Sequence, residues 1–495
     1  MSGGRTAWIL GDQLSHESPA LAGADRVLLV ESRAALMRPG LHRQKVHLVL
    51  SAMRHFATEL RGRGVEVDLR VAPTFRDGLA AHRAEYDPED VALLEPASAG
   101  AHDTLGVLPR VRLVRGALFV LHPEEFRAWA AGRKRLRMED FYRWQRRRLE
   151  VLMDGSEPTG GRWNLDTENR RPPPRDHRPP EPATLTEDEI DAAVRRDLDA
   201  LDLPSFGTDT ARRWPATRAE ARAVLDRFVA ERLRDFGPWQ DAMLHGERWM
   251  WHAHLSSSLN LGLISPLECV EAVEDAYRAG GVPLASAEGF IRQVIGWREY
   301  VWGTYWLLRE TFADANALGA EAPLPALFWG EPTDMRCLSD VVDGLRTTAY
   351  AHHIERLMLF GNLMLLLGVA PRQAVEWFRV AFIDGYEWVM EPNVVGMALW
   401  ADGGRMMTKP YAASGRYVNR MSDHCRGCRY DPTTRTGPAA CPYTTLYWDF
   451  LDRTRPHLED NRRTANAYRN LDGIPDAEMD EIRTRGQALR ENFTA

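Results

Sequence analysis

The stretch AWILGDQ at residues 7–13 decides the fold class, because a short apolar run ends there in a glycine and two polar residues. Similar runs with β-branched residues recur over the first 120 residues, and helical patterns separate them. Strands that alternate with helices predict βαβ units and an α/β fold with a doubly wound parallel sheet. The expected strands are 7–10, 27–31, 65–71, 91–95 and 111–114, and the expected helices between them include 44–61 and 75–86.

The carboxyl edge of such a sheet is where ligands usually bind. Gly11, Asp12 and Gln13 directly follow the first strand, and Glu31 closes the second. We therefore expect these residues to lie at one edge of the sheet. No GxGxxG motif follows the first strand, so the dinucleotide-binding fingerprint is missing.

The composition changes after this region. Residues 155–182 are rich in Pro, Gly, Arg and Asn, which predicts a linker running over the surface. Most of the chain beyond it has helical periodicity. We predict an α/β domain over 1–132, an interdomain helix and linker over 133–215, and a large all-α domain over 216–495. The expected helices are 185–201, 218–235, 266–278, 287–309 and 341–366.

Composition narrows the class of protein. The 495 residues carry a formal net charge of -7, with 44% hydrophobic and 27% charged residues, as in ordinary globular proteins. The N-terminus has no secretory pattern, and the longest apolar run, 357–370, is interrupted by Gly361 and Asn362. It is shorter than the roughly 20 residues that a membrane helix needs. We expect a cytoplasmic monomer without a membrane partner.

Residues 127–148 form a basic stripe in which nine arginines and lysines face two acidic residues. Interleaved aromatic residues suit contact with a phosphate backbone, but a solvated helix face is the plainer interpretation. The chain also contains 16 tryptophans, as many as phenylalanines. They indicate either a large core or oxidisable rings near a redox cofactor.

The cysteines suggest a metal site. Cys425 and Cys428 form a CxxC turn, Cys441 follows with a proline behind it, and Cys337 lies 88 positions before Cys425. A pair, a single cysteine and a distant one suit an iron–sulfur cubane, while zinc and unrelated thiols stay open as alternatives. Cys269 lies on an apolar helix face and is expected in the core.

Several further motifs occur in order along the helical region. They are WHAHLSSSLN at 251–260, GWREY at 296–300, HHIERLM at 352–358, FIDGYEW at 382–388 and TKPYAASG at 408–415. Serine hydroxyls and amides at a helix start suit a pyrophosphate. Together with GRWN at 161–164 and NRRP at 169–172, these motifs resemble the photolyase–cryptochrome superfamily, and in particular its bacterial (6-4) photolyase branch with a 4Fe–4S cluster.

This resemblance implies three cofactors. FAD would lie in the helical domain, 6,7-dimethyl-8-ribityllumazine in the α/β domain as a light-harvesting antenna, and the 4Fe–4S cluster on Cys337, Cys425, Cys428 and Cys441. Asn393 is spaced two residues further along than in ordinary photolyases. The implied FAD residues are His254, Ser256, Ser257, Ser258, Asn260, Trp297, Glu299, Asp384 and Asn393, and the antenna residues are Gly11, Asp12, Gln13, Glu31 and Lys45.

The implied activity is light-driven repair of (6-4) photoproducts in UV-damaged DNA. His353 would supply a proton, with His352 and Tyr411 beside it. Electrons would reach the flavin through Trp377 and Trp329. The linker arginines Arg170 and Arg171 would hold the DNA strand, and Asp166, Glu168 and Asp241 form a candidate Mg²⁺ site.

Two other functions remain open from the sequence. A cryptochrome-type light sensor would have the same cofactors without repair. A nucleic-acid-binding module with a structural iron–sulfur domain, as in primase large subunits, would bind no flavin.

Overall fold

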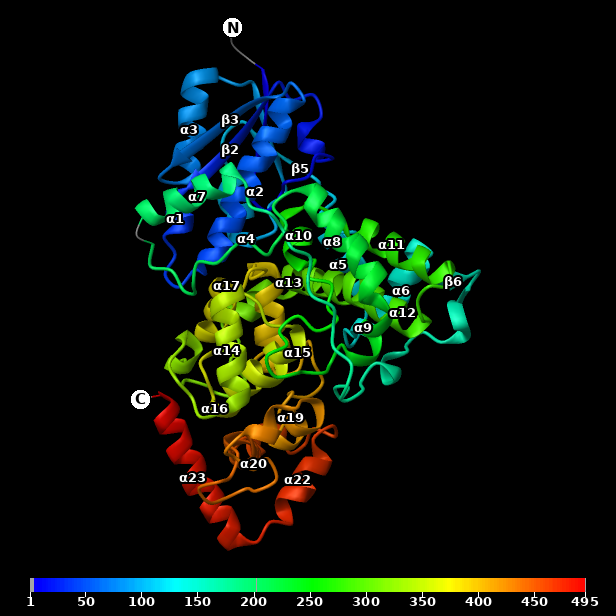
Figure 1. Cartoon of the computed structure of the whole chain (residues 1–495), viewed down its shortest axis with the longest axis vertical. Helices are drawn as coiled ribbons and strands as arrows, with labels where there is room; N and C mark the ends of the chain where they lie inside the picture. The colour runs from blue at the N-terminus through cyan, green and yellow to red at the C-terminus, as the bar shows by residue number, and fades with distance from the viewer. Residues whose placement is uncertain (1–3, 202, 495) are drawn as a thin grey trace.

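The computed structural model describes residues 4–201 and 203–494, and it begins with a parallel sheet of five strands. The strand order is β3-β2-β1-β4-β5, and every neighbouring pair is parallel. The predicted doubly wound α/β fold is therefore confirmed (Figure 1). The strands are β1 (Arg5–Ile9), β2 (Arg26–Ser32), β3 (Glu66–Ala72), β4 (Asp90–Leu94) and β5 (Val111–Val114).

Helices cover both faces of this sheet. Ala7 and Ile9 pack with residues of α2 (Arg43–Gly62) on one face. Trp8 packs with residues of α3 (Phe75–Tyr86) and α4 (Ala99–Leu105) on the opposite face. Alternate side chains of a strand point to opposite faces, so β1 must be apolar throughout. The order of the strands changes direction at β1, which opens a crevice at its carboxyl end.

The rest of the chain is helical, and in Figure 1 it runs from the sheet to a C-terminal group of helices at the far end of the molecule. α5 (Pro123–Ala130) and α6 (Met138–Leu149) pack against this part rather than against the sheet. The helices that follow are α7 (Glu189–Ala200), α8 (Arg218–Glu231), α9 (Leu233–Trp239), α10 (Ser256–Leu261), α11 (Pro266–Arg278), α12 (Leu284–Ile291), α13 (Glu299–Ala313), α14 (Arg336–Thr348), α15 (His353–Glu355), α16 (Asn362–Leu367), α17 (Pro371–Ala381), α18 (Glu387–Glu391), α19 (Gly415–Met421), α20 (Pro442–Arg453), α21 (Arg455–Leu458), α22 (Ala465–Asp472) and α23 (Asp476–Thr494).

The predicted single helix over 341–366 is wrong. α14 ends at Thr348, and Ala349 adopts a left-handed conformation with φ of 57°. The amide of Ile383 donates to the carbonyl of Ala349 at 2.8 Å, so a tertiary contact replaces the helical bond. Helical structure resumes at His353, and this break places two histidines at the start of a short helix.

The basic stripe is largely a structural element. Arg146 is buried and donates to the backbone carbonyls of Val151 and Leu152, while Arg148 pairs with Glu125 at 2.7 Å. Arg147 lies 4.5 Å from the ring of Trp163. These contacts fasten α6 to the linker, and contact of the exposed part of the stripe with a phosphate backbone stays a prediction.

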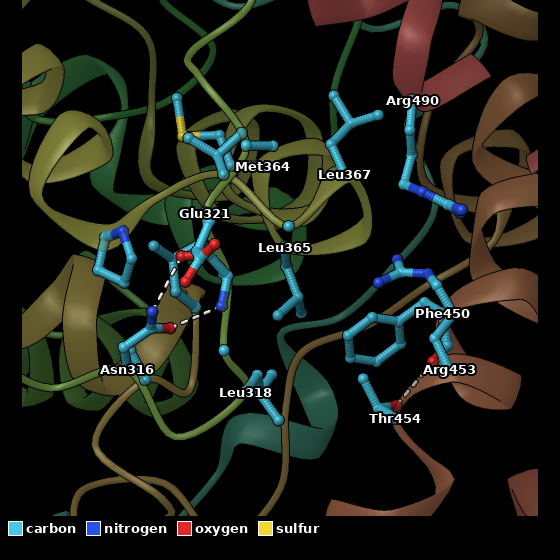
Figure 2. A pocket seen from close by; sticks show the side chains of 18 of the residues that line it. Asn316, Leu318, Glu321, Met364, Leu365, Leu367, Phe450, Arg453, Thr454 and Arg490 are labelled. Atoms are coloured by element: carbon cyan, nitrogen blue, oxygen red, sulfur yellow. Dashed lines mark hydrogen bonds between the residues drawn. The ribbon is translucent and has the colours of Figure 1, made fainter. Parts of the chain in front are cut away.

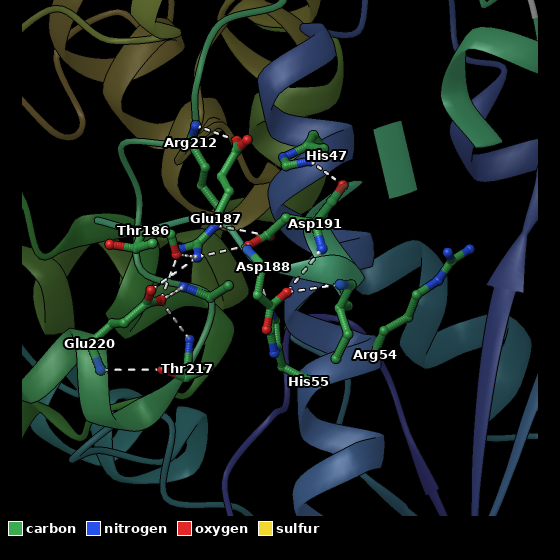
Figure 3. A network of polar contacts seen from close by, with 12 residues as sticks. His47, Arg54, His55, Thr186, Glu187, Asp188, Asp191, Arg212, Thr217 and Glu220 are labelled. Carbon is green, nitrogen blue, oxygen red and sulfur yellow. Dashed lines mark hydrogen bonds and ion pairs between the residues drawn. The ribbon is translucent and has the colours of Figure 1, made fainter. Parts of the chain in front are cut away.

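An ionic network fixes the end of the linker (Figure 3). The buried guanidinium of Arg212 makes two 3.0 Å hydrogen bonds to Asp191 of α7 and bonds of 2.8 and 2.9 Å to Glu220 of α8. His55 of α2 lies 3.8 Å from the same Asp191. Because charges buried in this way must be paired, the network joins three helices from both parts of the chain. Within the described residues, no helix is both long and apolar enough to span a membrane.

Candidate functional site

The serine motif lies in a strained turn at the start of α10. Met250 and His254 both have positive φ angles, 44° and 56°, which are uncommon for non-glycine residues. Arg232 holds this turn through the carbonyl of His252 at 3.2 Å and the Nδ1 atom of His254 at 3.1 Å. Burial lowers the pKa of His254 to about 3, so its ring is neutral.

Two hydroxyls of the motif are buried without partners. Ser257 and Ser258 are 1% and 0% exposed, and their Oγ atoms make no hydrogen bond to any residue that the structure describes. A buried hydroxyl of this kind costs free energy unless a ligand completes it. The turn therefore fits the polar part of a bound cofactor.

Asp384 lies beside this turn. Arg356 donates to both of its carboxylate oxygens, at 2.7 and 3.2 Å, and Asn260 donates to its carbonyl at 3.3 Å. Burial raises the pKa of Asp384, but the Arg356 charge outweighs this and leaves the pKa below its usual range. Asn393 donates to the carbonyl of Val389 at 2.8 Å, on the next helical segment. The structure thus joins Asn260 and Asp384, which are 124 residues apart.

Three π-helical segments occur in the described chain, and each carries a predicted motif. They are η4 (Arg292–Arg298), η6 (Arg356–Gly361) and η7 (Pro392–Ala398). Such segments are rare and are frequent at functional sites, because they bring an extra residue into one turn. Sequence periodicity gave no signal for them.

Three histidines from two segments lie together. The rings of His252 and His352 stack at 4.7 Å, and His353 contacts His252 edge-on at 5.4 Å. His352 is 1% exposed, and neither of its ring nitrogens has a hydrogen-bond partner among the described residues. Burial, and then the neighbouring imidazoles, lower the pKa of His252 well below its usual range. His353 is the exposed member of the group.

His353 is held by Asp241. Its Nε2 atom lies 3.1 Å from the Asp241 Oδ1 atom. Burial raises the pKa of Asp241, but the hydrogen bond and charge of His353 outweigh it, and the pKa lies below its usual range. Tyr411 is in the same electrostatic neighbourhood, and burial raises its pKa. Asn362 of α16 fixes the Tyr411 loop through reciprocal bonds to Ala413, at 2.9 and 3.0 Å.

Arg170 and Arg171 are exposed on the linker. The amide of Arg171 donates to the carbonyl of Pro238 at 3.0 Å, which holds the linker against α9. The three carboxylates of the candidate Mg²⁺ site are each paired with protein groups. Asp166 pairs with Arg170 and with Arg292, Glu168 pairs with Arg162, and Asp241 pairs with His353.

Two predicted FAD residues lie in a different aromatic cluster. Glu299 accepts bonds from the amides of Val120 and Leu121, at 2.8 and 3.0 Å, and from Arg298 at 2.8 Å. Trp297 packs edge-on against Tyr300 with 6.2 Å between ring centroids. Glu299 therefore braces the chain before α5, and the predicted contact of both residues with FAD stays a prediction.

The predicted antenna residues surround the carboxyl edge of β1. Asp12 is half-buried, and desolvation raises its pKa to about 6. Gln13 donates to the carbonyl of Leu94 at 3.0 Å and so bridges β1 and β4. A side chain on Gly11 would meet the Val49 Cγ1 atom at 2.9 Å.

Glu31 and Lys45 both have protein partners. Glu31 accepts two bonds from Arg54, at 2.8 and 2.9 Å. Lys45 donates to the carbonyls of Arg379 and Gly385, and burial lowers its pKa to about 7. Of the two predicted carboxylates at this edge, that of Glu31 is paired with Arg54, whereas Asp12 is the one that could contact a ligand. The other four predicted residues shape the edge.

The two predicted electron-transfer tryptophans are linked through Phe328, the residue before Trp329. Trp377 is fully buried and packs against Phe382 at 5.3 Å, two residues before Asp384. Its indole nitrogen donates to the carbonyl of Phe328 at 3.0 Å, and Trp329 follows with 42% of its surface exposed. Electron transfer through Trp377 and Trp329 stays a prediction.

Four cysteines meet at one small cavity. Cys337 comes from the start of α14, Cys425 and Cys428 from the turn η8 (His424–Gly427), and Cys441 from the residue before α20. All are free thiols, and burial, followed by the nearby thiols, raises the pKa of Cys337. Cys269 lies in a separate apolar core, as predicted. Clustered buried thiols of this kind fit a metal centre, because a cation must offset their negative charge.

A different hollow lies between the loop at 316–323, the end of α16 and α20 (Figure 2). Its lining is mostly apolar, with Arg453 donating to the carbonyl of Leu366 at 2.8 Å. It is distinct from the site around His353. Sequence reasoning missed Arg356, Arg232 and the role of His252, since no local pattern shows which residues converge there.

The comparisons with known proteins agree with this geometry. Residues 7–214 match the family model described as deoxyribodipyrimidine photo-lyase-related protein. The chain is 41% identical to the (6-4) photolyase of Agrobacterium fabrum, over 97% of this chain and 98% of that protein.

Two solved structures share the fold. A bacterial class III photolyase from Agrobacterium tumefaciens has a TM-score of 0.60 at 15% identity, covering 99% of this chain and 98% of that chain. The cryptochrome of Synechocystis sp. PCC6803 has a TM-score of 0.57 at 12% identity, covering 100% and 99%. The architecture is therefore that of photolyases and cryptochromes. The chain belongs to the (6-4) photolyase family. The alternative of a nucleic-acid-binding module like that of primase large subunits therefore has no support.

Proposed function

We propose that this protein repairs (6-4) photoproducts in UV-damaged DNA with the energy of light. The observation that carries the proposal is the exposed His353 ring, held by Asp241 at the edge of two buried histidines. The relative with 41% identity, named a (6-4) photolyase, supports the same lesion. Photolyases are among the enzymes that extrude the target base from the duplex, so the lesion would enter beside His353.

FAD is the cofactor that the family implies, and when bound in reduced form and excited by light it supplies an electron to the lesion. Ser257 and Ser258 would bind its phosphates, because their buried hydroxyls need a polar partner. Asp384 would orient its ring system, with Arg356 keeping the carboxylate charged. Asn260 couples the two segments through the Asp384 carbonyl.

His353 would donate a proton to the lesion while the transferred electron resides there. Without a proton, the charged lesion returns the electron, so proton delivery makes bond breakage competitive. Asp241 would position the ring. The neutral His252 and the buried His352 would form the wall behind it, and Tyr411 would bound the opposite side.

The exposed arginines Arg170 and Arg171 would hold the phosphates that flank the flipped lesion. Arg170 already pairs with Asp166, so this carboxylate offsets part of its positive charge. Mg²⁺ at Asp166, Glu168 and Asp241 stays a prediction, as do the monomeric state and the cytoplasmic location.

The four-cysteine cavity would hold a 4Fe–4S cluster. Tetrahedral zinc is the alternative with the same four thiol ligands. The cluster would be structural, since it joins α14, η8 and α20. The lumazine antenna would lie at the carboxyl edge of β1, next to Asp12, where the strand order changes direction.

Repair by the purified full-length protein tests the proposal. An absorption spectrum identifies flavin, cluster and lumazine bands, and an oligonucleotide with one (6-4) lesion is then illuminated or kept dark. We expect light-dependent loss of the lesion and no loss in the dark. A flavin-containing protein that leaves the lesion intact under illumination would favour the light-sensor alternative instead.

A further inference from the structure

We propose that His245, Asp340 and His424 form a binding site for one divalent transition-metal ion, separate from the four cysteines. His245 lies in the turn between α9 and the His252 segment, Asp340 lies in α14, and His424 begins η8. One donor atom from each residue lies within 4.8 Å of the others. The inference does not depend on the repair activity or on the metal that the cysteines bind.

The donor geometry suits zinc. The Nδ1 atom of His245 is 3.3 Å from the Asp340 Oδ2 atom, and the Nδ1 atom of His424 is 3.9 Å from it. The two imidazole rings are 5.6 Å apart and nearly perpendicular, at 80°. Zinc bonds of about 2.0–2.2 Å to nitrogen and oxygen require donors a little over 3 Å apart. Small side-chain rotations would bring these three atoms to that spacing.

His424 supplies the second, independent indication of a ligand. Its side chain is 1% exposed, and neither ring nitrogen has a hydrogen-bond partner in the parts of the chain that the structure describes. An unsatisfied buried polar group destabilises the folded state. A metal ion on the Nδ1 atom would remove that cost for one nitrogen, and the ring also lines the cysteine cavity.

Backbone contacts hold the three segments together without a metal. The amide of Met243 donates to the carbonyl of Met421 at 2.9 Å, and the amide of His245 donates to Asp423 at 2.7 Å. The amide of Gly246 donates to the Asp340 Oδ2 atom at 2.9 Å, which orients the carboxylate. Such outer contacts are what position ligands in natural metal sites.

The location indicates what the ion would do. Asp340 is three residues after Cys337 on the same helix face, and His424 directly precedes Cys425. An ion here would therefore tie two of the three cysteine-bearing elements, α14 and η8, to the turn that leads to His252. Two imidazoles and one carboxylate favour zinc or another divalent transition ion over magnesium.

Zinc binding to the full-length protein, purified with its own cofactors, tests this site. The protein is treated with a mild chelator, incubated with zinc sulfate and freed of unbound metal, and zinc and iron are counted by mass spectrometry. X-ray absorption at the zinc edge distinguishes nitrogen and oxygen neighbours at about 2.0–2.2 Å from sulfur at about 2.3 Å. His245→Gln and Asp340→Asn remove one ligand each, and the exposed position of His245 makes its variant the safer of the two for folding.

We expect one zinc ion per wild-type chain with nitrogen and oxygen neighbours, and loss of that ion in both variants while the iron content is unchanged. His353→Asn changes the separate group of His252, His352 and His353, and this variant should keep the zinc. A wild-type protein without stoichiometric zinc, zinc bound to sulfur, or zinc retained in His245→Gln would overturn the proposal.

Discussion

The Nε2 atom of His353 lies 3.1 Å from the Oδ1 atom of Asp241, a residue 112 positions earlier in the chain. The contact joins the segment after α9 to the start of α15. It leaves His353 exposed while Asp241 is largely buried behind it. A proton donor at the mouth of the site is thus held by a carboxylate below it.

Asp241→Asn should lower lesion repair at least about tenfold without weakening DNA binding. Asparagine keeps the shape of the side chain but removes the carboxylate charge that faces the His353 ring. Repair under single-turnover illumination and the affinity for the damaged oligonucleotide separate the two effects. Asp103→Asn, in a surface pair with His102 at 3.2 Å, is the matched control. Equal losses of repair and of DNA affinity in Asp241→Asn would mean that Asp241 serves binding alone.

Trp377→Phe should slow the light-driven reduction of FAD. Phenylalanine keeps most of the packing against Phe328 and Phe382 but removes the oxidisable indole. Trp8→Phe, in the core of the sheet, controls for the loss of a buried tryptophan. Flavin absorbance under illumination with an external reductant gives the rate. A Trp377→Phe rate equal to wild type would exclude this route.

Cys441→Ser should yield insoluble protein, or protein without iron and FAD. The four thiols join segments that are otherwise far apart in sequence, so metal binding contributes directly to folding. Cys269→Ala, which lies in another core, should keep both iron and flavin. Soluble, flavin-bound and active Cys441→Ser protein without iron would show that the cluster is dispensable.

His42→Asn should make stability less sensitive to acid. His42 accepts a bond from the Gln44 amide at 3.2 Å through Nδ1, and its Nε2 atom lies 3.0 Å from the Leu345 carbonyl, so the buried ring must be neutral. Burial lowers its pKa to about 4. The unfolded chain takes up a proton below about pH 6.5, so this contribution is complete above that pH and is lost as the pH falls toward 4.

Between pH 6.5 and pH 4 the free energy of unfolding of the wild type should therefore fall by up to about 3 kcal/mol more than that of His42→Asn. Asparagine still caps α2 but does not titrate in this range. Apparent unfolding temperatures at several pH values provide the comparison, with the surface variant His102→Asn as control. Parallel curves for wild type and His42→Asn would contradict this assignment.

The sequence predicted the sheet well because the central strands β1, β2 and β4 are buried on both faces, which makes them continuous apolar runs. The helices at 75–86 and 266–278 have the predicted bounds because capping residues flank them. The break at Ala349 was not predictable, because no glycine or proline marks it and a contact with Ile383 stabilises it. The burial of Arg146 was likewise not predictable, because it depends on how the chain after α6 folds back over this side chain.

The candidate site was predictable where motifs are local. The serine turn, the paired histidines and the CxxC turn are each continuous in sequence. The partners Asp241 and Arg356 were not predicted in these roles, because their contacts depend on tertiary packing over 112 and 28 residues. The π-helical segments also depend on that packing.

His353→Ala tests the central claim most directly. The variant should retain FAD and normal photoreduction, because His353 is exposed and packs only at the edge of the histidine group. It should lose nearly all repair of a (6-4) oligonucleotide, with at least about a hundredfold decrease in the rate per absorbed photon. Near-wild-type repair by flavin-loaded His353→Ala protein would contradict the proposed role of His353 as the proton donor.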